Sequence, residues 1–126
     1  MDILPVRVLI VEDEPSVRFS LAGFLEDFNF DVLTAETAEE ALELMVKEPC
    51  QVAIVDIRLP GIDGNEMILK AHEMIPNMRF IIYTGSLDYR LSEDLKSIGT
   101  KPEHVFPKPQ QDLSVFVGAI QELMVS

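Results

Sequence analysis

Charged and hydroxyl side chains stand at the points where several apolar segments of this sequence end. They are Glu12 and Asp13, Asp56, Thr84, and Lys108. Carboxylate groups bind hard cations such as Mg²⁺, a lysine supplies a positive charge for a phosphate group, and a hydroxyl can donate a hydrogen bond to it. A carboxylate can also accept a phosphoryl group as an aspartyl phosphate. If these residues converge, they favour phosphoryl chemistry over acyl or glycosyl chemistry.

Asp56 is the best placed of these residues to be the nucleophile. It follows Val52–Val55, an unbroken apolar run typical of a strand that is buried on both faces, and Pro60 and Gly61 then turn the chain. Open α/β sheets bind their ligands at the carboxyl ends of strands. Because a buried charge is costly unless it is paired, we expect cationic groups around Asp56, namely a metal ion and Lys108.

The elements that must position these residues alternate along the chain. Strands are predicted at residues 6–11, 31–35, 52–55, 79–84 and 104–106. Helices are predicted at residues 15–28, 38–48, 64–75, 87–98 and 113–124. This alternation predicts an α/β fold, a doubly wound parallel sheet with helices on both faces. The carboxyl ends of all the strands then lie along one edge, and we expect one domain over residues 1–126.

Local signals support the first three of these helices. The first carries an apolar stripe at helical spacing, formed by Val17, Leu21, Phe24, Leu25 and Phe28. Thr37 and Glu40 have the spacing of a capping pair, and so do Asp63 and Glu66. These pairs predict where the second and third helices begin.

Composition excludes several classes of protein. The 126 residues are 48% hydrophobic, which supports a packed core, and the net charge of −12 disfavours direct binding to nucleic acid. No apolar run approaches the roughly 20 residues needed to span a bilayer, so we expect a soluble, cytoplasmic protein. The single cysteine, Cys50, excludes a disulfide within the chain. We interpret the acidic run from Glu36 to Glu43 as a solvated helix face.

Taken in order, these motifs resemble the receiver domain of two-component response regulators over essentially the whole chain. The motifs are Glu12-Asp13, the run Asp56–Gly64, Thr84 with a small residue after it, and Lys108-Pro109. The resemblance implies a five-stranded sheet of order 2-1-3-4-5 with five helices. It also implies that a histidine kinase or histidine phosphotransfer protein phosphorylates Asp56. A downstream effector protein or output domain would read the change.

The resemblance also implies roles at the site. Mg²⁺ would be held by Asp13, Asp56 and the backbone carbonyl of Arg58, with Glu12 acting through water. Thr84 and Lys108 would assist phosphotransfer, and the Lys108–Pro109 peptide bond would be cis. The chain would be a signalling phosphoacceptor that assists its own phosphotransfer and autodephosphorylation, and not an enzyme in the usual sense.

The sequence departs from the family pattern in two places. The family usually has an aromatic residue three positions before the lysine, where this chain has Val105. The interval between Thr84 and Lys108 is also slightly longer than usual, which makes the conformation of residues 99–104 uncertain. His72 and His104 have no partners at metal-ligand spacing, so both are expected to be surface or packing residues.

Three other functions compete with this interpretation. An aspartyl-phosphate hydrolase of the haloacid dehalogenase type needs an Asp-x-Asp pattern after the first strand, and this chain has Glu12-Asp13-Glu14 instead. A flavodoxin-like FMN binder needs a phosphate loop there, and these acidic groups would repel a phosphate. A receiver-like adaptor that binds partners without phosphorylation stays open as the alternative.

Overall fold

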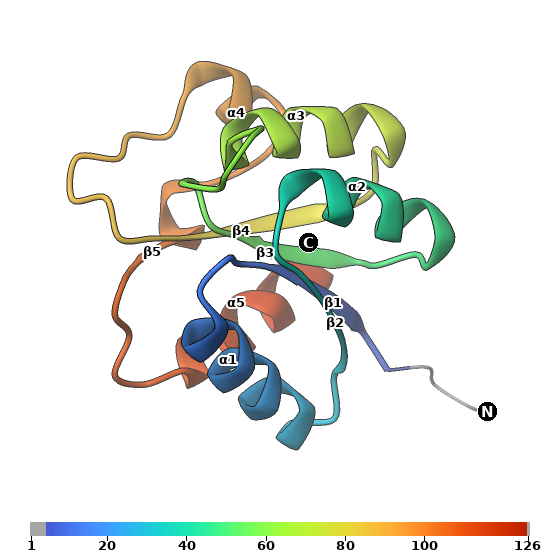
Figure 1. Cartoon of the computed structure of the whole chain (residues 1–126), viewed down its shortest axis with the longest axis vertical. Helices are drawn as coiled ribbons and strands as arrows, with labels where there is room; N and C mark the ends of the chain where they lie inside the picture. Colours follow the sequence, from blue (N-terminus) through green and yellow to red (C-terminus); the bar gives the residue numbers. More distant parts are fainter. Residues whose placement is uncertain (1–4, 126) are drawn as a thin grey trace.

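A computed structural model describes residues 5–125 of the chain. The described residues form one five-stranded parallel sheet in the order β2-β1-β3-β4-β5 (Figure 1). The strands are β1 (Arg7–Val11), β2 (Asp31–Ala35), β3 (Val52–Val55), β4 (Arg79–Thr84) and β5 (Val105–Pro107). The helices are α1 (Pro15–Asp27), α2 (Ala38–Lys47), α3 (Gly64–Met74), α4 (Glu93–Ser97) and α5 (Ser114–Met124). The predicted fold class and strand order are confirmed.

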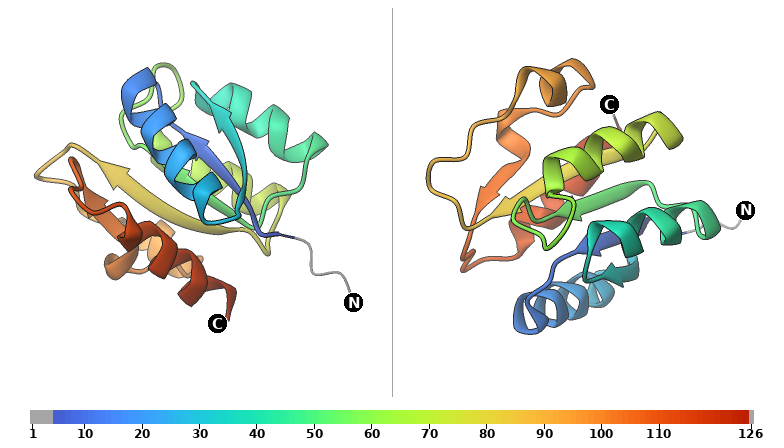
Figure 2. Two further views of the ribbon diagram at one scale, coloured as in Figure 1. Left: turned by 90° about the horizontal axis from the view of Figure 1, so that it is seen from below. Right: turned by 45° about the horizontal axis from the view of Figure 1, so that its top comes forward.

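Helices cover both faces of the sheet. Helices α2, α3 and α4 lie on one face, and α1 and α5 lie on the other (Figures 1 and 2). Each face has its own apolar cluster, the first with Met45, Met67 and Leu95, and the second with Leu25 and Phe116. The residues of β3 are almost completely buried, as expected for a central strand between two layers of helices.

Two helices begin at the predicted caps. The backbone N–H of Glu40 donates to Oγ1 of Thr37 (3.1 Å), and that of Glu66 donates to Oδ1 of Asp63 (2.9 Å). Each contact satisfies one of the N–H groups that a helix leaves without a partner in its first turn. The capping prediction is therefore confirmed for the start of α2 and of α3.

Helix α4 is much shorter than predicted. Residues 85–92 form an irregular loop, and Leu87, the first residue of the predicted helix, is 89% exposed. Helix α4 begins only after Ser92, whose hydroxyl accepts the Leu95 N–H at 3.2 Å. The residues between α4 and β5 contain Gly99 at φ +99° and a 3₁₀ turn at Pro102–His104.

The stripe predicted for α1 is partly wrong. Phe28 follows the helix and is 49% exposed, whereas Arg18 is buried beside Leu21, Ala22 and Leu25. Asn29 adopts φ +68°, a left-handed conformation that asparagine tolerates at the end of a helix. The buried face of α1 therefore carries a cation.

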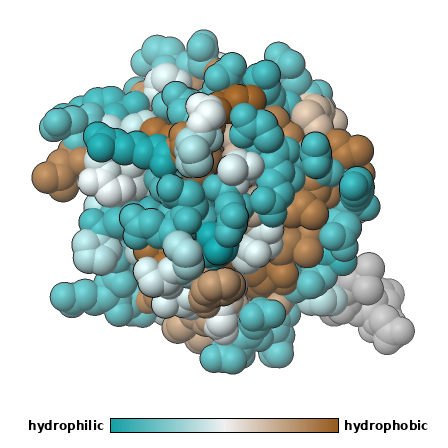
Figure 3. Space-filling view, in the orientation of Figure 1, coloured by the Kyte–Doolittle hydropathy of each residue, from teal (hydrophilic) through white to brown (hydrophobic). Residues whose placement is uncertain are grey.

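One face of the molecule is mainly hydrophilic. Figure 3 shows hydrophilic residues over most of one face, with apolar residues in smaller areas between them. The acidic residues Glu36, Glu39, Glu40 and Glu43 are all exposed, as predicted for a solvated face. No helix within residues 5–125 has both the length and the apolar character needed to cross a membrane.

Candidate functional site

The carboxyl ends of β1 and β3 bring three carboxylates together. These two strands pair in parallel with Val11 opposite Val55, and the Asp56 N–H donates to the Val11 carbonyl at 3.0 Å. The next residue on each strand therefore projects from the same edge. Oxygen atoms of Glu12, Asp13 and Asp56 all lie within 4.8 Å of one another. This confirms the convergence that the strand ends predict.

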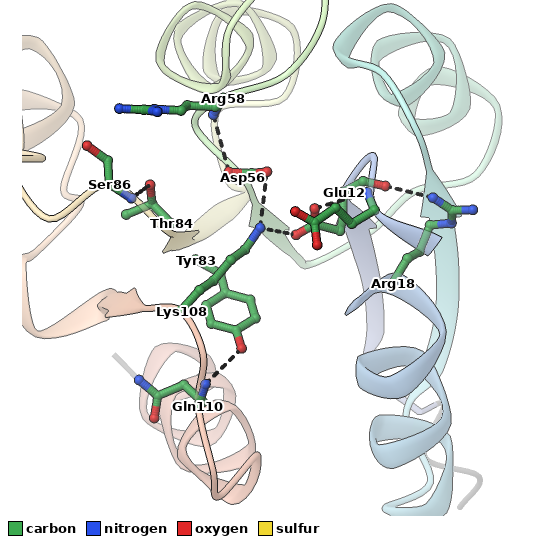
Figure 4. Close-up of polar contacts among 10 residues, drawn as sticks. Glu12, Arg18, Asp56, Arg58, Tyr83, Thr84, Ser86, Lys108 and Gln110 are labelled. Atoms are coloured by element: carbon green, nitrogen blue, oxygen red, sulfur yellow. Dashed lines mark hydrogen bonds and ion pairs between the residues drawn. The ribbon is translucent and has the colours of Figure 1, made fainter. Parts of the chain in front are cut away.

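Lys108 reaches this cluster from the loop after β5. Its Nζ lies 2.6 Å from Oε1 of Glu12 and 3.1 Å from Oδ2 of Asp56 (Figure 4). The backbone N–H of Lys108 donates to the Thr84 carbonyl at 2.8 Å, which extends the pairing of β4 with β5. The Lys108–Pro109 peptide bond is cis, as the resemblance implies. A lysine thus stands between two carboxylates at one edge of the sheet.

Burial governs the charge state of Glu12. Its pKa is raised from 4.5 to about 7, first because Glu12 is desolvated and also because Asp56 is close, while the hydrogen bond from Lys108 opposes the rise. Repulsion from Asp56 therefore contributes to the raised pKa of Glu12, but it ranks behind desolvation. For Lys108, burial alone would lower the pKa, and the contacts with Glu12 and Asp56 outweigh it and raise the pKa.

Thr84 lies at the end of β4, next to β3. Its side chain is buried, and its Oγ1 accepts the Ser86 N–H at 3.1 Å. Because this contact uses an oxygen lone pair, the Thr84 hydroxyl hydrogen is left available to donate to another group. Within residues 5–125, no hydrogen bond joins Thr84 to Asp56 directly, so Thr84 lines the site without contacting its carboxylates.

Arg58 contributes its backbone to the site. Its N–H donates to Oδ1 of Asp56 at 3.2 Å, while its side chain is exposed and extends away from Lys108 (Figure 4). Oδ1 of Asp56 therefore accepts a backbone N–H, and Oδ2 accepts the Lys108 ammonium. These two contacts fix the plane of the Asp56 carboxylate.

Sequence reasoning missed Tyr83. The Tyr83 ring lies beneath Lys108, with Nζ 5.4 Å from the ring centroid, and the Tyr83 hydroxyl accepts the Gln110 N–H at 3.1 Å. The ring also packs edge-on against Phe116. Strand alternation is the sequence signal that bears on Tyr83: successive residues of a strand point to opposite faces, so Tyr83 lies on the other face of β4 from Thr84.

Arg18 was missed as well. Its guanidinium donates to the backbone carbonyl of Glu12 and to the carboxylate of Glu36. Its spacing from Leu21 and Ala22 on α1 was the signal that could have identified it as a residue of the buried face.

The donor set fits a hard divalent cation. Glu12 and Asp56 are buried and Asp13 is exposed, so the carboxylate cluster is open to solvent on one side. Mg²⁺ is bound in proteins by one or two carboxylates and keeps several waters or phosphate oxygens. The three side chains can therefore offer the oxygen ligands that Mg²⁺ prefers.

Comparison with known proteins agrees with this geometry. CpdR, a response regulator receiver protein of Brucella abortus, is 28% identical over 95% of this chain and 98% of its own. YesN, an uncharacterized transcriptional regulatory protein of Bacillus subtilis, is 25% identical over 94% of this chain, which spans about a third (32%) of YesN. The crystal structure of a CheY-like receiver domain protein from Methanospirillum hungatei has a TM-score of 0.83 and 30% identity, with 96% of this chain and 95% of that chain covered. A family model described as the response regulator receiver domain matches residues 8–114, and the chain therefore belongs to this family.

Proposed function

We propose that this chain is a phosphoacceptor that takes a phosphoryl group from a phosphohistidine onto Asp56. The observation that carries the proposal is the position of Lys108, whose ammonium joins Glu12 and Asp56 where the buried strand β3 ends. Phosphoryl transfer depends mainly on positioning and charge neutralisation. A fixed carboxylate beside a partly buried lysine provides both.

In the proposed step, a carboxylate oxygen of Asp56 attacks phosphorus while the bond between phosphorus and the histidine nitrogen breaks. The electron pair of that bond stays with the imidazole. The Arg58 N–H and the Lys108 ammonium hold the Asp56 carboxylate in place before attack. Lys108 can then pair with a phosphoryl oxygen, and the Thr84 hydroxyl can donate to another.

Asp13, Asp56 and the backbone carbonyl of Arg58 would hold Mg²⁺, with Glu12 acting through water. When bound, the cation supplies positive charge against the phosphoryl oxygens. Glu12 would then give up the proton that burial favours at neutral pH, because a nearby cation stabilises its ionised form.

The proposed partners are a sensor histidine kinase or a histidine phosphotransfer protein as donor, and an effector protein or output domain that reads the phosphorylated state. A phosphohistidine donor is made with ATP inside the cell, so the proposal includes a cytoplasmic location. Autodephosphorylation, by attack of water on the aspartyl phosphate, would reset the domain.

Intact-mass measurement tests the proposal. The wild-type protein, incubated with a small phosphodonor such as acetyl phosphate and Mg²⁺, should gain the mass of one phosphoryl group that hydroxylamine removes. Asp56→Asn should abolish the gain. Asp88→Asn, the same change at an exposed residue of the loop after β4, should leave it intact.

Two results would contradict the proposal. Phosphoryl uptake by Asp56→Asn equal to that of wild type would show that another residue is phosphorylated. No uptake with acetyl phosphate, phosphoramidate or a phosphorylated histidine phosphotransfer protein would favour an adaptor that binds partners without phosphorylation.

A further inference from the structure

Arg18 is a buried cation next to the carboxylate cluster, and it touches none of the three carboxylates of that cluster. The residue is only 5% exposed, on the face of α1 that packs against the sheet. A buried guanidinium is costly unless its donors are satisfied. Its Nη1 donates to the backbone carbonyl of Glu12 at 3.0 Å (Figure 4). Its Nη2 donates to Oε1 of Glu36 at 2.9 Å.

The first of these contacts acts on the peptide group that joins Glu12 to Asp13. The Glu12 N–H is already fixed, because it donates to the Ala35 carbonyl at 3.0 Å. Arg18 holds the carbonyl of the same residue, so both backbone polar groups of Glu12 have partners. The Glu12–Asp13 peptide plane sets the direction in which the next side chain, that of Asp13, leaves the backbone.

The second contact, the ion pair with Glu36, should contribute less. Glu36 has a side chain that is 61% exposed, and exposed ion pairs contribute little to stability. The bond to the Glu12 carbonyl is buried. The carbonyl contact is therefore the one that should matter at the site, and the two contacts can be separated by mutation.

We propose that Arg18 is a positioning residue for cation binding: by holding the Glu12 carbonyl, it orients the Glu12 and Asp13 carboxylates toward one ion. The inference rests on the proposed function, since the ion is the Mg²⁺ of that proposal. Groups behind metal ligands commonly change metal affinity by about 10- to 100-fold when they are removed. The expected effect of losing Arg18 lies at the lower end of this range, because β-sheet pairing also holds Glu12.

Three variants test the inference. Arg18→Met removes the donors and keeps an unbranched side chain, Arg18→Lys keeps a charge that can donate to the carbonyl, and Glu36→Gln removes only the ion pair. Mg²⁺ dissociation constants are measured from the amide chemical shifts of Asp13 and Asp56, without any phosphodonor. The measurements are made at about pH 8, where Glu12, with its pKa of about 7, is mostly ionised.

The expected order separates positioning from general stabilisation. Arg18→Met should bind Mg²⁺ about 10-fold more weakly than wild type, Arg18→Lys about threefold, and Glu36→Gln within about twofold. The metal-free spectra of all the proteins should show dispersed peaks, which confirms that each compared protein is folded. Unchanged affinity in Arg18→Met, or an equal loss in Glu36→Gln, would overturn the inference.

Two further results are decisive. If Arg18→Met does not fold, Arg18→Gln, whose terminal nitrogen lies two bonds closer to the backbone than the guanidinium nitrogens, takes its place, and wild-type affinity in that variant overturns the inference. If wild type itself does not bind Mg²⁺, the metal site of the proposed function fails first. Wild-type binding with unchanged Arg18→Met binding refutes the positioning role alone.

Discussion

The ammonium of Lys108 lies closer to Glu12 than to Asp56, with Nζ 2.6 Å from Oε1 of Glu12 and 3.1 Å from Oδ2 of Asp56. The carboxylate with the raised pKa is thus the one that holds the lysine most closely. Asp56 retains a second contact, from the Arg58 N–H. Lys108 therefore links the proposed nucleophile to a group that titrates near neutral pH.

Replacing Lys108 should raise the pKa of Glu12 further. The hydrogen bond and charge of Lys108 both lower this pKa, while desolvation and Asp56 raise it. In Lys108→Met, the pKa of Glu12 should rise above about 7, as followed by the NMR carboxyl shift of Glu12 against pH. Lys101→Met, at an exposed lysine outside the cluster, is the matched control. An unchanged or lower pKa would show that Lys108 does not stabilise ionised Glu12.

The free energy of unfolding should depend on pH because Glu12 titrates at a higher pH in the folded protein than in the unfolded chain. Between about pH 4.5 and pH 7, folded Glu12 keeps a proton that the unfolded chain releases, so this group makes stability fall as pH rises through that window. The free energy of unfolding of Glu12→Gln, relative to that of wild type, should therefore increase by about 1–3 kcal/mol between roughly pH 5 and pH 8. Urea unfolding of both proteins at the two pH values measures the difference. Glu14→Gln, at the exposed neighbour, should show no such gain, and an equal gain there would assign the effect elsewhere.

Asp13 should matter for the metal and not for the metal-free fold. Its side chain is exposed beside two other carboxylates, so removing its charge relieves repulsion without opening a cavity. Asp13→Ala should keep or raise the Tm of the metal-free protein. Asp13→Ala should also lose the increase in Tm that Mg²⁺ causes in wild type. In this variant, Asp56 should no longer be phosphorylated. Thermal unfolding with EDTA and with Mg²⁺ measures both, and a marked loss of Tm in EDTA would assign Asp13 a structural role.

Residues 58 and 86 should set the lifetime of the phosphorylated state. The family resemblance implies that the side chains two positions after Asp56 and Thr84, here Arg58 and Ser86, flank the path of the water that attacks the phosphoryl group. Arg58 is long and exposed and can screen this path, whereas Ser86 is small and leaves it open. Arg58→Ala and Ser86→Ala should change the rate of phosphoryl loss several-fold while phosphorylation itself continues. Decay of the phosphorylated mass with time measures the rate. Decay equal to wild type in both variants would exclude these residues from the path of the attacking water.

Phosphorylation should change the face formed by α4, β5 and α5 only slightly. Val105 is a short, stiff side chain that packs with the apolar cluster on the face covered by α2, α3 and α4. Tyr83 and Phe106 pack with the cluster on the other face, which α1 and α5 cover. Neither ring therefore occupies the position of Val105. Amide chemical shifts with Mg²⁺ and beryllofluoride should change mainly near the site and in the loop after Thr84. Large changes throughout α4, β5 and α5 would show a full switch without an aromatic residue at position 105.

The sequence by itself determined the parallel sheet and the edge of the sheet at which the site residues lie. Apolar runs that end in polar residues specify buried parallel strands, and the common edge of such a sheet forces Glu12 and Asp56 together. Local hydrogen bonding likewise fixes the helix starts after Thr37 and Asp63. Family resemblance added the strand order and the cis bond before Pro109.

Only the tertiary structure decided which polar groups are buried and what they contact. Apolar spacing over residues 87–98 predicted a short helix, yet the helix forms only at Glu93–Ser97. Leu95 is fully buried and Leu91 and Ile98 are partly buried in the same cluster, whereas Leu87 stays exposed. Arg18 enters the buried face of α1 because the Glu12 carbonyl and Glu36 supply acceptors there, and these come from other parts of the chain. The balance of charge between Glu12 and Lys108 depends in the same way on burial and on distances across the sheet edge. Such quantities arise only when separate segments are brought together.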